Sequence, residues 1–233
     1  IVIAAKNRLY MSSDAGISWR QVCNFDGTWW DLRWHPTNNN VCYGLVQQGT
    51  TIAFVRSTGA GAKFDIVGQG YPSATNGMKM VRALLGVTPA MQDMVSVAIG
   101  GSVGDTLSGT YGIYVSTDQG STFEHRCCGS VDGPEQPDGV RNPNVFDYDI
   151  GGKGLGQITW DMGFAVSTTD PNLMVVAGIF PYVSKDGGRS WTSLPAMHYD
   201  VQSVAIRGDS IWLTTDGGVH LSPDRGATIR ERS

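Results

Sequence analysis

The stretch Ser184-Lys-Asp186-Gly-Gly188-Arg-Ser190-Trp191 follows a pattern, Ser-x-Asp-x-Gly-x-(Ser/Thr)-aromatic, that returns several times in this chain. Four copies keep the Ser, Asp, Gly and hydroxyl positions, and the last of them ends in Ile. They cover residues 12–19, 116–123, 184–191 and 222–229. A decayed fifth copy, 57–64, has Gly59 in place of the Asp. Copies roughly 40–70 residues apart indicate a repeat architecture such as a propeller or a solenoid. We call this pattern the Asp motif.

The composition favours an all-β fold of short strands. The 233 residues include 31 Gly, only 16% are charged, and no apolar 3.6-residue period is sustained, so we expect very little helix. A net charge of −4 argues against a nucleic-acid-binding protein, and no apolar run is long enough to span a membrane. Because the first residue is Ile, we expect that an upstream segment is missing.

Each Asp motif falls between the third and fourth strand-like runs of a repeat. An Asp side chain can accept backbone N–H bonds inside a turn, and Gly two residues later supplies a positive φ. The last repeat predicts strands at 201–206, 210–214, 219–221 and 227–230. First strands of earlier repeats are expected at 29–34, at 80–85 and from about 158, with second strands at 41–46, 94–98 and 173–177.

Four-stranded antiparallel units repeated in this way predict a β-propeller with the first strand of each blade innermost. The expected blades are 1–26, 27–68, 78–126, 157–196 and 199–233, with an insertion at 127–156. The first repeat begins at its second strand, so one blade lacks its innermost strand. Since an open arc would expose sheet edges, we expect the chain to be part of a larger propeller of six to eight blades or of an assembly.

The four intact motifs resemble the Asp box, or BNR repeat, of sialidases, xyloglucan-degrading glucanases, sortilin-type receptors and photosystem assembly factors. The Asp170-Pro-Asn172 turn and the run 215–222 are also similar to secreted bacterial members. The resemblance covers nearly the whole chain and implies a propeller in an extracellular or cell-surface protein. It does not select a function, because these relatives include hydrolases, receptors and assembly factors.

The motif carboxylates are expected to be structural. In a blade, the turns between third and fourth strands lie on the face away from the one that usually carries the site. The residues concerned are Asp14, Asp118, Asp186 and Asp224.

The opposite face holds the candidate site. Three first strands open with aromatic-Asp-apolar, which would bring Asp31, Asp161 and Asp200 around the channel mouth. Two carboxylates across a cleft are what glycoside hydrolysis needs. The alternative is that each Asp accepts hydrogen bonds from backbone as a tie between blades. The neighbouring Trp30, Trp160 and Tyr199 could stack on sugar rings, although most such aromatics should be core.

Two connections, 101–110 and 127–157, are expected to project on this same face and to contact a glycan or a protein partner. Asp147-Tyr-Asp149-Ile-Gly151 in the second is spaced like a short calcium loop, with a solvated acidic loop as the alternative. No other cofactor is predicted. The four histidines lack zinc-ligand spacing.

The cysteines leave the disulfide pattern open. Cys23 and Cys42 fall at comparable positions in successive repeats and could pair, whereas neighbours such as Cys127 and Cys128 seldom bond to each other.

Two functions remain. The first is a non-catalytic extracellular propeller that binds a glycan or a protein, or serves as a scaffold. The second is a glycoside hydrolase that uses two of the three candidate carboxylates. The Arg-(Ile/Leu)-Pro motif of sialidases does not occur, and Arg33 and Arg82 are the arginines expected on inner strands.

Overall fold

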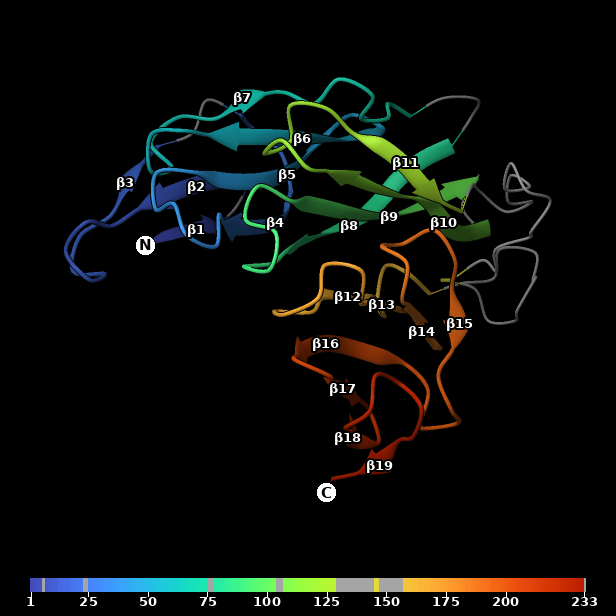
Figure 1. The fold of residues 1–233 in the computed structure, drawn as a ribbon. Coiled ribbons are helices and arrows are strands. Elements are labelled where there is room, and N and C mark those ends of the chain that lie inside the picture. The colour runs from blue at the N-terminus through green and yellow to red at the C-terminus, as the bar shows by residue number, and fades with distance from the viewer. Residues whose placement is uncertain are drawn as a thin grey trace.

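The computed structural model describes residues 1–5, 7–22, 25–74, 78–103, 107–128, 145–146 and 157–232. These residues form nineteen strands and no helix. The strands make five antiparallel sheets that follow one another in chain order, and the two chain ends lie apart at the first and last sheets (Figure 1).

The first sheet has three strands, β1 (Val2–Ala5), β2 (Arg8–Met11) and β3 (Arg20–Gln21). The other four sheets have four strands each, paired in sequence order. They are β4 (Trp29–Trp34), β5 (Cys42–Gln48), β6 (Thr51–Ser57) and β7 (Asp65–Ile66); β8 (Met78–Val87), β9 (Val95–Val103), β10 (Leu107–Ser116) and β11 (Glu124–Cys127); β12 (Gly163–Val166), β13 (Met174–Ala177), β14 (Pro181–Ser184) and β15 (Thr192–Ser193); and β16 (Val201–Arg207), β17 (Ser210–Thr215), β18 (Gly218–Ser222) and β19 (Arg230–Glu231).

The first strands of successive four-stranded sheets lie against one another, β4 against β8, β8 against β12, and β12 against β16. This arrangement is the inner layer of a propeller. The predicted fold class is therefore confirmed: an all-β chain of propeller blades, each with its Asp motif between the third and fourth strands and the first blade lacking its innermost strand.

Two predicted strands begin several residues later than expected. The strand expected from about 158 begins at Gly163, because the N–H groups of Trp160 and Asp161 both donate to the Gln157 carbonyl and close a turn there, at 2.8 and 2.9 Å. The last strand begins at Arg230 instead of 227, because the preceding turn extends to Thr228, whose N–H donates to Asp224.

The expectation that residues 101–110 form a loop is wrong, whereas their place between the second and third strands of a blade is as expected. Most of this segment is strand, since Ser102 pairs with Ser108 and Gly101 with Gly109 in the β9–β10 hairpin. Residues 104–106 at its tip lie outside the described residues. The sequence Gly-Gly-Ser suggested a loop, but pairing with β8 and β10 extends β9 to Val103.

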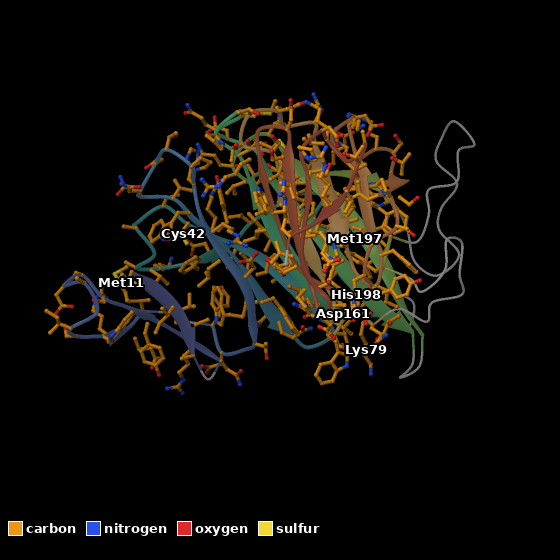
Figure 2. The ribbon with its side chains drawn as sticks, turned by 90° about the horizontal axis from the view of Figure 1, so that it is seen from below. Met11, Cys42, Lys79, Asp161, Met197 and His198 are labelled. Carbon is orange, nitrogen blue, oxygen red and sulfur yellow. A yellow bond between two sulfur atoms is a disulfide. The ribbon has the colours of Figure 1, made fainter. Side chains whose placement is uncertain are left out.

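The core lies between neighbouring sheets. Tyr43 and Phe54, fully buried in the second sheet, stack with ring centroids 5.9 Å apart, and Phe54 meets Phe123 of the third sheet edge to face at 4.9 Å. Cys42 is buried in the same sheet, and burial raises the pKa of its thiol to about 12 (Figure 2).

The disulfide runs between the neighbours Cys127 and Cys128, both buried, so the expectation that this pair stays unbonded is wrong. Cys128 has a positive backbone φ of 58°, which is uncommon for a residue other than glycine. A Cys23–Cys42 bond is not formed, since Cys42 is a free thiol. Cys23 itself lies outside the described residues.

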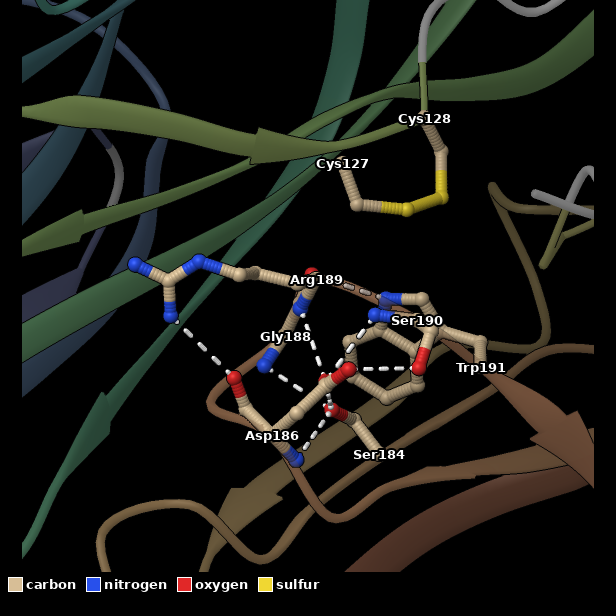
Figure 3. Close-up of a disulfide and its surroundings, with 8 residues drawn as sticks. All are labelled: Cys127, Cys128, Ser184, Asp186, Gly188, Arg189, Ser190 and Trp191. Atoms are coloured by element: carbon tan, nitrogen blue, oxygen red, sulfur yellow. Dashed lines mark hydrogen bonds between the residues drawn. A yellow bond between two sulfur atoms is a disulfide. The ribbon is translucent and has the colours of Figure 1, made fainter. Parts of the chain in front are cut away.

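The Asp motif is a closed hydrogen-bond network (Figure 3). The Ser184 hydroxyl donates to Asp186 Oδ1 at 2.7 Å and accepts the N–H of Gly188 at 2.8 Å. Asp186 Oδ1 accepts the N–H of Ser190 and Oδ2 accepts its hydroxyl, at 2.9 and 2.5 Å. The Trp191 Nε1–H closes the turn on the Gly188 carbonyl at 3.1 Å. The motifs of Asp14, Asp118 and Asp224 repeat the Ser–Asp–Gly–hydroxyl bonds.

In four of the five copies, a second hydrogen bond fastens the motif to its own sheet. The residue after the Asp position has a positive φ, and its N–H donates to a carbonyl in the turn between first and second strands. The bonds join Gln119 to Asp93, Gly187 to Asn172, Arg225 to Asp209 and, in the decayed copy, Ala60 to Asn40, at 2.8 to 3.0 Å. Both sets of turns therefore lie on one face, which we call the motif face.

The motif glycine touches the preceding sheet. A Cβ on Gly120, which has φ +80°, would lie 2.3 Å from the Phe54 ring of the second sheet. A Cβ on Gly226 would lie 2.3 Å from Leu194 of the fourth. The glycine thus supplies both the turn conformation and the space for the neighbouring blade.

We predict that Gly120→Ala lowers the free energy of unfolding by about 2–4 kcal/mol, because the methyl group clashes with Phe54 in addition to the cost of the positive φ. The matched control is Gly49→Ala, since Gly49 has φ +63° and open space around it; its cost should stay near 1 kcal/mol, about the penalty of the backbone alone. Urea unfolding of both variants measures the difference, and equal losses would contradict the docking role of Gly120.

The Asp motif also predicts how the stability of the folded protein depends on pH. Hydrogen bonds from the side chain and N–H of Thr228 lower the pKa of Asp224 to about 2. A carboxyl group with a lowered folded-state pKa adds stability above its unfolded pKa of about 4 and loses it as the pH falls through the folded value. The difference in Tm between the wild type and Asp224→Asn should therefore be largest near neutral pH and shrink between pH 4 and 2. A difference that is constant over this range would contradict the assignment.

Candidate functional site

The face opposite the motif face carries the connections between sheets and the turns between second and third strands; we call it the connection face. The connection entering β16 is fixed there to the neighbouring sheet. The N–H groups of Asp200 and Val201 donate to the carbonyls of Ile179 and Gly178, in the β13–β14 turn, at 3.1 and 2.9 Å. Residues far apart in sequence meet at this point.

Asp161 lies at the centre of the candidate site. It precedes β12, is 4% exposed, and its Oδ1 accepts a hydrogen bond at 2.5 Å from Gln202 of β16 (labelled with His198 in Figure 2). Burial raises the pKa of Asp161, and the charges of Asp200 and Asp216 raise it further, against the Gln202 bond. We call Asp161, Asp200 and Asp216 the acidic cluster.

Asp200 directly precedes β16 and has a φ of 63°. Asp is one of the few residues that adopt this left-handed conformation readily. Its side chain is half-buried. Asp216 is exposed in the β17–β18 turn, so three separate elements supply the acidic cluster.

Asp31 has different surroundings. Its Oδ1 accepts the N–H of Leu32 at 2.8 Å, and its Oδ2 accepts the N–H of Leu85 in β8 at 3.0 Å. Burial raises the pKa of Asp31, opposed by Arg33 and by these two N–H groups. The arrangement matches the alternative from the sequence, a backbone tie between blades, and the structure unites only Asp161 and Asp200 of the three predicted carboxylates.

Two of the three candidate aromatics are exposed on the connection face, Trp160 to 74% and Tyr199 to 55%. Trp30 instead packs against the core, and its Nε1–H donates to Gln47 at 2.9 Å. The turn that carries Trp160 is held by Arg82 of β8, whose Nη1 donates to the carbonyls of Trp160, Thr159 and Ile158 at 3.0, 3.3 and 3.4 Å.

Sequence reasoning missed the partners of Asp161. Gln202 lies two residues after Asp200, and Asp216 lies just before the predicted strand 219–221; neither was predicted as a site residue. Of the two arginines expected on inner strands, Arg82 donates hydrogen bonds to backbone carbonyls. No sequence signal pairs these residues, because they meet only when β8, β12 and β16 lie side by side.

The predicted calcium ligands Asp147 and Asp149, and most of the connection 127–157, lie outside the described residues. Within the described ranges, no group of three His, Cys, Asp or Glu residues is arranged to hold a metal ion. The described residues also contain no helix long and apolar enough to cross a membrane.

Comparisons with known proteins identify the fold. No protein-family model and no curated protein matches the sequence. Among solved structures, the GH74 xyloglucanase from Xanthomonas campestris matches with a TM-score of 0.64 and 16% identity over 94% of this chain and 34% of its own. A PL25 ulvan lyase bound to -[GlcA(1-4)Rha3S]- gives 0.56 and 11% over 97% and 61%, and YCF48 bound to D1 peptide gives 0.55 and 13% over 96% and 61%.

The predicted resemblance to sialidase- and xyloglucanase-type propellers is therefore confirmed at the level of the fold. The chain spans 24% and 34% of the lengths of two of the GH74 enzymes that it matches.

We predict that Asp31→Ala destabilises the protein by about 1–3 kcal/mol, because the N–H of Leu85 loses its acceptor. Asp200→Asn should change stability by less than about 0.5 kcal/mol, since Asn keeps the left-handed conformation and the side chain is half-buried. Denaturant unfolding compares the two variants. If Asp31→Ala is as stable as the wild type, the carboxylate is not a structural tie.

Proposed function

We propose that this protein is a non-catalytic extracellular or cell-surface propeller that binds a glycan on its connection face. The observation that carries the proposal is the pair of exposed aromatic rings, Trp160 and Tyr199, each followed in the chain by a carboxylate of the acidic cluster. Aromatic faces bury the C–H face of a sugar ring, and carboxylates accept hydrogen bonds from its hydroxyl groups.

Hydrogen bonds hold both segments of the site in fixed positions. Arg82 fixes the turn of Trp160 through three carbonyls, and two backbone bonds fix the segment that ends at Asp200. A site that is already ordered loses less entropy on binding. The fold neighbours include proteins whose names refer to xyloglucan and ulvan and also one bound to a peptide, so the choice of a glycan rests on the residues of the site.

A glycoside hydrolase is the second candidate, and one observation favours it. Asp161 has a raised pKa, to which the neighbouring charge of Asp200 contributes, and a carboxyl group with a raised pKa is what the general acid of a glycoside hydrolase requires. Against this, Asp161 is 4% exposed and engaged by Gln202, so it is poorly presented to a glycosidic oxygen.

We predict that Trp160→Ala weakens glycan binding at least about tenfold, roughly the 1.4 kcal/mol expected from losing one stacking ring, with no change in Tm. Affinity electrophoresis against xyloglucan, mixed-linkage β-glucan, ulvan and polysialic acid measures binding. The matched control is Trp212→Ala, a 39% exposed tryptophan on β17, which should bind as the wild type does.

The same mixtures are assayed for new reducing ends. Binding without turnover supports the proposal. Turnover that is lost in Asp161→Asn while the Tm is kept would replace it by the hydrolase, and failure to bind any of the four polysaccharides would overturn both.

A further inference from the structure

The connection between β15 and β16, residues 194–200, is fixed at both ends to almost the same place. The N–H of Leu194 donates to the Pro181 carbonyl at 3.0 Å, and the N–H of Asp200 donates to the Ile179 carbonyl at 3.1 Å. Because Ile179 and Pro181 are two residues apart, the segment must leave and return over the beginning of β14. We call residues 194–200 the arch.

A pocket of about 320 Å³ lies between the arch and β14. Its walls are mainly apolar, and the ring centroids of Phe180 and Tyr199 are 5.0 Å apart at an interplanar angle of 76°. Leu194, Pro195 and Met197 supply further apolar surface from the arch. Ser193, Tyr182 and His198 add polar atoms to the lining, and the described residues that line the pocket include no Asp, Glu, Lys or Arg.

The arch is also held from its other side. The His198 ring lies on Gly217, where a Cβ would be 2.3 Å from the His198 Cδ2. The Leu194 side chain is buried against Gly226 in the same way. The last sheet therefore packs against the arch and holds it in place. Small-molecule sites are usually pre-formed in this way.

The lining of the pocket and the charges near it restrict which class of ligand can bind. Where Phe180, Leu194 and Pro195 form the wall, their side chains offer a hydroxyl group no hydrogen-bond partner, and a buried hydroxyl without a partner costs about 1–3 kcal/mol. Tyr199 leads directly into Asp200 of the acidic cluster, whose negative charges disfavour uronates, sulfates and sialic acids. Those same carboxylates accept hydrogen bonds from the hydroxyl groups of a neutral sugar.

We propose that the pocket under the arch binds one neutral sugar of the glycan through an apolar substituent, the methyl group of a 6-deoxyhexose. The methyl group enters between Phe180 and Leu194, and the ring rests on Tyr199 with its hydroxyl groups toward Asp200. This inference rests on the proposed function and names the sugar class that the connection face selects.

Matched methyl glycosides test the proposal by NMR titration of the wild-type protein. The pairs are L-fucoside and L-galactoside, L-rhamnoside and L-mannoside, and 6-deoxy-D-glucoside and D-glucoside, each differing only in the 6-hydroxyl group. In at least one pair the 6-deoxy member should bind about tenfold more tightly, the lower end of what one group in an apolar pocket discriminates.

Filling the pocket should remove this preference. Ala196 lines the pocket and is exposed, so Ala196→Trp should abolish the discrimination, with Ala196→Met as a milder variant in case the larger ring prevents folding. The control is Ala90→Trp on the motif face, at another exposed alanine, which should keep it.

The outcomes separate this inference from the proposed function. Equal affinities within all three pairs, or a preference that survives in both Ala196 variants, overturn the inference, while Trp160-dependent polysaccharide binding would still stand. Tighter binding of N-acetyl-tryptophanamide than of every glycoside would also overturn it, in favour of a peptide side chain as the occupant.

Discussion

Blade docking in this protein depends on the glycine of the Asp motif, which must adopt a positive φ and also leave room for the side chain of the preceding sheet. The Ser and Asp of the motif hold that glycine in place by hydrogen bonds to its N–H and across the turn. The next bond, from the residue after the Asp position to the first turn of the same sheet, joins the innermost strand to the outer hairpin. One short segment thus determines the turn, the integrity of the blade and the contact between blades. Its decayed copy retains the Ser57–Gly61 bond and the Ala60–Asn40 bond, which indicates that the glycine geometry is needed even where the carboxylate is absent.

The motif face and the connection face differ in how freely their residues can vary. The motif face is filled by backbone and side-chain hydrogen bonds that repeat from sheet to sheet, so it has little freedom to vary. The connection face is built from segments that are unique to each blade, among them the turn of Trp160 and the arch over β14. Ligand sites commonly occur on loops held by a rigid scaffold, and the acidic cluster and the apolar pocket both lie on such segments. The acidic cluster itself draws on two sheets, since Asp161 precedes β12 of the fourth sheet and Asp216 lies in the β17–β18 turn of the fifth.

The predictions made from sequence succeeded for features that depend on residues close together in the chain. They failed for features that depend on pairing between residues far apart in the chain. The positions of the four motif turns follow from residue types within eight positions, and the inner strands at 29–34 and 201–206 lie within the observed β4 and β16. The glycine-rich 101–110 segment looked like a loop, yet cross-strand bonds to β8 and β10 make it strand. Asp31 and Asp161 stood in the same tripeptide pattern, but one is a backbone tie to Leu85 and the other lies in the acidic cluster. The bonded neighbours Cys127 and Cys128 were likewise invisible to spacing rules.

The sequence by itself determined the repeat, its strand order and the side of each blade on which the motif carboxylates lie, because these follow from short-range turn chemistry. Only the tertiary structure decided which carboxylates meet, since Asp161, Asp200 and Asp216 are brought together by the packing of β12 against β16. It also decided that the arch encloses a pocket, because both of its anchors, Ile179 and Pro181, belong to a different part of the chain. Long-range packing has no signature in a single sequence, and it is long-range packing that assembles the connection face.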